Sequence, residues 1–136
     1  MSTRCQIGFY NENKSRLSNF EALLYRHCDG YPQGPSGVLA TIIPHLLDFD
    51  RNRGLNDPEY AAAWLCAKLK DGYTNIGISK DFHGDIAFYY AIRPNGTIEI
   101  WRCNRGNPTE SNGEVSIHDD SWKKIYLKEE SVPKPS

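Results

Sequence analysis

Several signatures that would narrow the function are absent from this sequence of 136 residues. No apolar run approaches the roughly 20 residues that a membrane-spanning helix needs, which excludes a helical membrane protein. The cysteines form no C-x-x-C pair, so the local ligand spacing of structural zinc sites is missing. A nucleophile elbow, a phosphate-binding P-loop and an H-E-x-x-H motif are also lacking, and these are common marks of enzymatic chemistry.

An excess of charge of either sign is lacking as well. The chain carries 16 basic and 17 acidic residues, a formal net charge of −1. Binding to duplex nucleic acid depends on a basic surface, so this balance argues against it. A compact anionic ligand needs only a few well-placed cations, and that class of ligand stays open.

The composition that is present predicts one globular domain. Hydrophobic residues make up 39% and charged residues 24%, which is typical of folded proteins. We expect the domain to span residues 1–127, and residues 128–136 to be a flexible tail because they lack apolar periodicity. No hydrophobic signal core follows Met1, which predicts a cytoplasmic protein. In that reducing compartment we expect the cysteines to be free thiols. We expect neither a metal nor a cofactor.

The hydrophobic patterns predict an α+β fold with the element order ββααβββ. We expect an antiparallel sheet of about five strands, with two helices packed on one face. Exposed strand edges would allow pairing into a homodimer. The expected strands are residues 3–10, 20–27, 84–92, 97–103 and a last β-like piece over 115–127, and the expected helices are residues 38–49 and 57–69.

Local signals sharpen some of these elements. Asp57-Pro58-Glu59 has the residue order of a helix start, and the turn over 93–96 (RPNG) predicts a hairpin. Ser36 is expected to cap the first helix, Pro44 to kink or divide it, and Gly54 to end it.

The segment 25–32 (YRHCDGYP) is the densest group of polar and aromatic side chains in the chain. One interpretation is a ligand pocket in which Arg26 binds a carboxylate or phosphate, His27 handles a proton, and Tyr25 or Tyr31 stacks on the ligand. The alternative is an ordinary turn, with Asp29 binding its own backbone and pairing with Arg26. The thiol of Cys28 is expected to be inert.

Other residues could complete such a site. Ser36 and Gly37 are expected to offer backbone donors at the start of the first helix, and Tyr89 a further stacking surface. In the segment 81–85 (DFHGD), His83 and Asp85 could act as a general base or form half of a metal site. Ordinary loops often have this composition as well. The segment 118–120 (HDD) is expected to be a solvated loop.

The opening Thr3-Arg4-Cys5, followed by the segment 25–32, resembles a pattern of small bacterial and phage proteins that have no assigned activity. The resemblance covers the first third of the chain. It implies a microbial or viral setting, with the host cytoplasm as location if the protein is viral. Small phage proteins often act by binding, for instance as inhibitors of host defence signalling.

Three classes of function follow from the residues. The favoured one is a small binding protein that captures an anionic or nucleotide-like ligand. The second is a hydrolase or nuclease-like enzyme that uses His27 or His83 with Asp29 or Asp85, which requires a nucleophile or water beside one histidine. The third is a protein–protein interaction module, with a host protein as partner, acting through a strand edge or the aromatic face around Tyr89 and Trp101.

Overall fold

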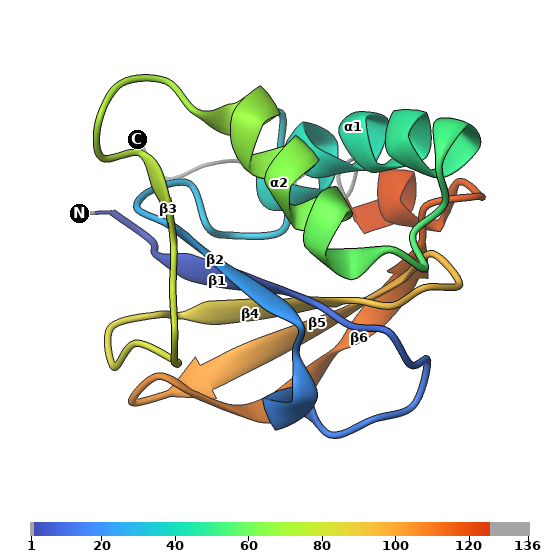
Figure 1. Ribbon diagram of the computed structural model, residues 1–136. Helices are drawn as coiled ribbons and strands as arrows, with labels where there is room; N and C mark the ends of the chain where they lie inside the picture. Colours follow the sequence, from blue (N-terminus) through green and yellow to red (C-terminus); the bar gives the residue numbers. More distant parts are fainter. Residues whose placement is uncertain (1, 126–136) are drawn as a thin grey trace.

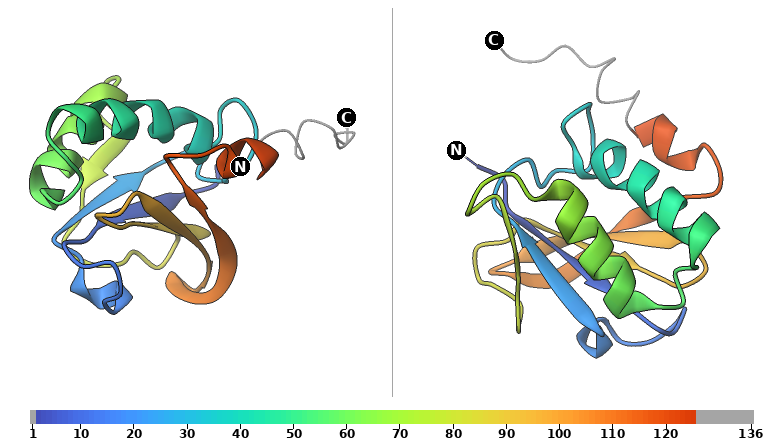
Figure 2. Two further views of the ribbon diagram at one scale, coloured as in Figure 1. Left: turned by 90° about the vertical axis from the view of Figure 1, so that its right-hand side faces the viewer. Right: turned by 45° about the horizontal axis from the view of Figure 1, so that its top comes forward.

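The structure is a computed structural model that describes residues 2–125. Its strands form one sheet with the neighbour order β3-β2-β1-β4-β5-β6. Two helices cover one face of that sheet, as Figure 1 and the turned views of Figure 2 show. The elements are β1 (Cys5–Phe9), β2 (Ala22–Arg26), α1 (Val38–Asn52), α2 (Pro58–Leu69), β3 (Ile76–Ile78), β4 (Phe88–Ile92), β5 (Thr97–Asn104) and β6 (Asn107–Ser116).

The α+β class and the placement of two helices on one face are confirmed. The sheet has one strand more than expected, because the three residues of β3 pair with β2 at an edge. The sheet is also mixed, since β1 runs parallel to β4 while every other pair is antiparallel. The element order is therefore ββααββββ.

The C-terminal part of the described chain differs from the sequence prediction. Strand β6 begins at Asn107, eight residues before the expected last β-like piece over 115–127, and it ends at Ser116. Arg105 and Gly106 both have positive φ angles, 52° and 81°, which is the geometry of a tight hairpin turn that folds β6 onto β5. The rest of the expected last strand is a turn followed by a helical segment over 121–125. The predicted tail at 128–136 lies outside the described residues.

Helix α1 begins at Val38, as expected, and ends at Asn52, three residues beyond the expected end. Its N-cap is Gly37 and not Ser36, and the helix continues through Pro44 without dividing. A side chain at position 37 would place its Cβ 2.0 Å from the carbonyl oxygen of Gln33, so the close approach of the preceding loop requires glycine there. Gly54, with a φ of 100°, follows the end of the helix and confirms the predicted stop.

Helix α2 confirms the predicted start, with Asp57 at the N-cap and Pro58 in the first turn. The Asp57 carboxylate does not cap the helix, and it forms an ion pair of 2.7 Å with Arg53 instead. Within the part of the chain that the structure describes, neither helix has the length and apolar character needed to cross a membrane.

Each face of the sheet has its own hydrophobic cluster. Cys5, Ile7 and Phe9 of β1 point toward the helices, and we call this side the helix-side face. The opposite side, which we call the outer face, buries Tyr10, Leu23, Ile86, Tyr89 and Ala91. Side chains from the loops 10–21 and 79–87 pack against this second cluster, so the chain itself covers much of the outer face.

Candidate functional site

The segment 25–32 is divided between the two faces of the sheet. Arg26 pairs with Cys5 across β1, and directly opposite residues point to the same side, so Arg26 lies on the helix-side face. Tyr25 pairs with Gln6 and packs against the outer-face cluster. The alternation along β2 therefore separates the cation of Arg26 from the rings of Tyr25 and His27.

On the outer face, Tyr25 meets residues from distant parts of the chain. Its hydroxyl donates a hydrogen bond of 2.8 Å to Asp85 Oδ2. Arg4 Nε lies 3.5 Å from the same carboxylate oxygen, as an ion pair with partly exposed side chains. That contact lacks hydrogen-bond geometry, since the buried Arg4 Nε has no hydrogen-bond partner among the described residues. The carboxylate of Asp85 thus contacts both the phenol of Tyr25 and the guanidinium of Arg4.

Two imidazoles lie close to the same phenol. The ring centroids of Tyr25 and His83 are 4.5 Å apart, and those of Tyr25 and His27 are 6.3 Å apart. Both histidines are exposed, whereas Tyr25 is half-buried. We call Arg4, Tyr25, His27, Ser79, His83 and Asp85 the ring cluster. The sequence left open whether the His27 and His83 segments converge, and in the structure the imidazoles of both lie near the ring of Tyr25.

Buried Gln6 holds the loop that carries His83. Its side-chain oxygen accepts a hydrogen bond of 2.9 Å from the backbone N–H of His83, and its amide nitrogen donates one of 3.1 Å to the carbonyl of Asp81. Gln6 is fully buried, so both of its polar ends are satisfied by this loop. The imidazole of His83 therefore rests on a backbone that is fixed from β1.

Ser79 supplies a hydroxyl to the ring cluster. Its Oγ lies 3.3 Å from His83 Nε2, and both side chains have access to solvent. The sequence analysis did not single out Ser79, Gln6 or the side chain of Arg4. The contacts of Gln6 with Asp81 and of Tyr25 with Asp85 join segments that are 75 and 60 residues apart in the sequence.

The surroundings of Tyr25 keep its hydroxyl protonated. Partial burial, together with the hydrogen bond to Asp85 and its negative charge, raises the pKa of Tyr25 to about 12. The nearby guanidinium of Arg4 opposes this shift without reversing it. Tyr25 is accordingly a neutral donor to Asp85 at physiological pH, and its contribution to binding would be its ring.

The helix-side group of the segment forms a separate arrangement. The Tyr31 hydroxyl donates to Asp29 Oδ1 at 3.1 Å, and Asp29 has a φ of 55°, which is turn geometry. The predicted alternative, in which Arg26 pairs with Asp29, is wrong, because those two residues form no ion pair and buried Arg26 Nη1 has no hydrogen-bond partner in the described chain. The turn is fastened to the sheet by a 2.6 Å hydrogen bond from Tyr90 Oη to the carbonyl of Gly30.

The start of α1 is closed by its own preceding loop. The backbone N–H groups of Gly37, Val38 and Leu39 donate to the carbonyls of Gly34, Tyr31 and Pro32, and Ser36 is exposed. The N–H of Gly37 is therefore not a free donor for an anion, whereas the expected role of Ser36 stays a prediction. The backbone donors of residues 37–39 are already satisfied within the loop.

Tyr89 cannot supply the predicted stacking surface. Its side chain is fully buried on the outer face, where its hydroxyl forms a hydrogen bond with that of Tyr10. Trp101 is half-buried in the same cluster, with its indole N–H donating to Glu99. The aromatic face that the sequence suggested around these two residues is thus internal packing.

Metal and cysteine chemistry have little support in this region. Among residues 2–125, no three His, Cys, Asp or Glu side chains are arranged to hold a metal ion. All four cysteines are free, and Cys28 is exposed. Burial raises the pKa of the Cys5 thiol to about 12, which makes it a poor nucleophile.

Comparison of the chain with protein-family models, with curated proteins and with solved structures gave no match.

Proposed function

We propose that this protein binds a small anionic, nucleotide-like ligand at the ring cluster. The observation that supports the proposal is the convergence of three rings and a guanidinium from three separate segments of the chain. Exposed imidazoles beside a phenol offer flat surfaces on which a planar ligand can stack. Arg4 and the ring N–H groups of the two histidines supply donors for a phosphate or carboxylate.

The division of polar and aromatic groups suggests how such a ligand would lie. Its planar part would stack on the exposed ring of His27 or His83, because the ring of Tyr25 is half-buried. Its anionic part would face the guanidinium of Arg4, whose side chain is one-third exposed. Asp85 would hold Arg4 and Tyr25 in place, since it contacts both.

The first test is native mass spectrometry of the full chain purified from cells, with denaturing release and identification of any small molecule. Titration calorimetry with nucleoside monophosphates and cyclic dinucleotides then measures affinity directly. Replacing a stacking ring or the cation, as in His83→Ala or Arg4→Gln, is expected to weaken binding by about tenfold or more. Tyr73→Ala is the matched control, because Tyr73 is 99% exposed and lies outside the ring cluster.

Binding that tolerates both site variants would contradict the proposal, as would the absence of any nucleotide or other anion that binds. A ligand lost in both site variants and retained in Tyr73→Ala would support it. Recovery of the ligand unchanged would favour binding over catalysis.

A hydrolase-type activity is the second candidate, favoured by one contact. Ser79 Oγ lies within reach of His83 Nε2, which meets the requirement for a nucleophile beside a histidine. Asp85 is engaged with Tyr25 and Arg4, and among the described residues no third side chain orients His83 in the manner of a catalytic triad. Incubation with phosphodiester and ester substrates tests this candidate, and Ser79→Ala would abolish any turnover that depends on the pair.

We further propose a biological role that rests on the resemblance of segment 25–32 to microbial and phage proteins. A binder of a host signalling nucleotide would lower its free concentration in the host cytoplasm and so inhibit defence signalling. Expression of the protein in bacteria that carry a nucleotide-dependent defence system, followed by phage challenge, tests this role. Restored phage growth that is lost in His83→Ala would support it, and unchanged defence would contradict it.

A further inference from the structure

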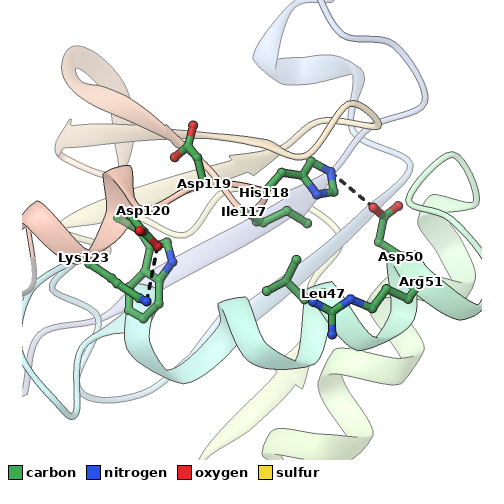
Figure 3. A pocket seen from close by; sticks show the side chains of 9 residues that line it. Leu47, Asp50, Arg51, Ile117, His118, Asp119, Asp120 and Lys123 are labelled. Carbon is green, nitrogen blue, oxygen red and sulfur yellow. Dashed lines mark ion pairs between the residues drawn. The ribbon is translucent and has the colours of Figure 1, made fainter.

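A cavity separate from the ring cluster lies between the C-terminal half of α1 and the segment that follows β6 (Figure 3). It is a cavity of about 290 Å³, close to the lower end of the size range of small-molecule sites. Leu47 of α1 and Ile117 of the following segment face each other across it, and Trp122 forms part of its wall. The ring cluster shares no residue with this cavity.

Most of the charges around this cavity are already paired. His118 Nε2 lies 3.3 Å from Asp50 Oδ2, and Lys123 Nζ lies 3.3 Å from Asp120 Oδ1. Asp119 Oδ1 accepts a hydrogen bond of 2.8 Å from the backbone N–H of Ser121, and its carboxylate points away from Leu47 and Ile117 in Figure 3. The segment expected to be a solvated loop is therefore joined to α1 by the contact between His118 and Asp50.

Arg51 is the exception among these charged residues. It lines the cavity, and within residues 2–125 it has neither an ion pair nor a hydrogen bond. Figure 3 shows its side chain extending along the cavity toward Leu47. A planar guanidinium with five N–H donors and no protein acceptor is suited to bind a carboxylate or phosphate in a two-pronged contact.

We propose that this cavity binds a compact organic anion, a carboxylate or phosphate monoester carried on an apolar ring. The anionic group would bind Arg51, and the ring would lie over Leu47 and Ile117. An anion is favoured over a cation because Asp50 and Asp120 already have basic partners and Asp119 points outward. Lys123 adds a second donor, since an exposed ion pair such as the one with Asp120 is easily rearranged.

Calorimetry and two-dimensional NMR of the full chain, titrated with benzoate and separately with phenyl phosphate, test the proposal. Saturable binding is expected, with shifts of the Trp122 indole N–H signal. Arg51→Gln should raise Kd by about tenfold or more, whereas Lys124→Gln, a neighbouring exposed cation that does not line the cavity, should leave it within about twofold. Acetate and inorganic phosphate, which carry the charge without the ring, should bind more weakly than the two ring-bearing probes.

Several outcomes would overturn the proposal. These are no saturable binding of either probe up to about 10 mM, equal affinity of wild type and Arg51→Gln, or shifts confined to residues of the ring cluster. The relative affinities of benzoate and phenyl phosphate identify which anion the cavity accepts. Binding that persists in His83→Ala would show that this cavity acts independently of the proposed function, so failure of one proposal leaves the other open to its own test.

Discussion

Tyr25 and Asp85 are joined by a hydrogen bond of 2.8 Å, although 60 residues separate them in the sequence. This bond links the end of β2 to the loop before β4, and it holds the phenol close to His27 and His83. The same carboxylate also neutralises part of the charge of Arg4. The geometry of the ring cluster therefore depends on one acidic residue.

This dependence predicts measurable coupling between Tyr25 and Asp85. In a double-mutant cycle with Tyr25→Phe and Asp85→Asn, the free energy of unfolding should show a coupling of about 0.5–1 kcal/mol, as expected for a partly exposed hydrogen bond. Urea denaturation of the four proteins measures it. Tyr25→Phe combined with Asp119→Asn is the control and should give additive effects, because those two residues are not in contact. Additivity in the first pair would mean that the bond contributes nothing to stability.

Alkaline pH should destabilise the fold through its buried tyrosines. Burial raises the pKa of Tyr10 to about 12 and those of Tyr89 and Tyr90 well above the usual value of 10.0. The folded state thus holds these protons more tightly than the unfolded state. Their contribution to stability is complete below pH 10 and is lost as the pH rises from 10 toward the folded-state values, by about 1.4 kcal/mol per pH unit for each tyrosine.

Urea unfolding between about pH 8 and pH 11 measures this loss. Tyr10→Phe removes one titrating phenol, and it should reduce the slope of unfolding free energy against pH above pH 10. A slope equal to that of the wild type would contradict the assignment to buried tyrosines. A stability that stays constant up to pH 11 would contradict it as well.

Arg93 is predicted to be essential for closing the N-terminal loop over the outer face. It is 3% exposed, pairs with Glu99 at 2.9 Å, and donates to Ser15 and to the carbonyl of Glu12. Arg93→Met would leave the Glu99 carboxylate without its partner, so we expect a loss of about 3–5 kcal/mol in unfolding free energy. Arg53→Met is the matched control, since the exposed pair with Asp57 should be worth less than about 1 kcal/mol. Equal losses in the two variants would contradict this role.

The parts of the fold that were predictable from the sequence are those with local causes. The start of α2 follows from the residue order Asp57-Pro58-Glu59, and the β4–β5 hairpin follows from a turn that ends in Gly96, whose φ is 89°. Strand β6 was missed because its exposed edge position allows a polar sequence without the usual alternation. The hairpin turn before it contains Arg105 at a positive φ angle, where Asn or Gly would have been the recognisable signal.

The candidate site was predictable in its residues but not in its grouping. Tyr25, His27, His83 and Asp85 were all candidates, yet their convergence depends on β2 lying beside β1 and on Gln6 holding the loop 79–87. Arg26 was grouped with His27 because the two are adjacent in the sequence. Successive side chains of a strand point to opposite faces of the sheet. Because Arg26 belongs to strand β2, its side chain lies on the face opposite to that of Tyr25 and His27.

The last prediction concerns Gly106, which links a backbone turn to the ring cluster. Its φ is 81°, and a Cβ there would lie 2.1 Å from the carbonyl oxygen of His83 and 2.6 Å from the Cα of Gly84. Gly106→Ala should therefore displace the backbone that carries His83, in addition to the strain of about 1–2 kcal/mol that a side chain incurs at positive φ. We expect a lower unfolding free energy together with weaker binding of the ring-cluster ligand.

Gly113 provides the matched control for this change. Its φ is 103°, so Gly113→Ala introduces similar backbone strain, but a Cβ there would meet nothing within 4 Å. Gly113→Ala should consequently reduce stability without altering ligand affinity or the NMR signals of the His83 and Tyr25 rings. If both variants left ligand affinity and those ring signals unchanged, the position of His83 would not depend on the β5–β6 turn. If Gly106→Ala alone shifted the ring signals and weakened binding, the turn between β5 and β6 would be established as the support that positions His83 beside Tyr25.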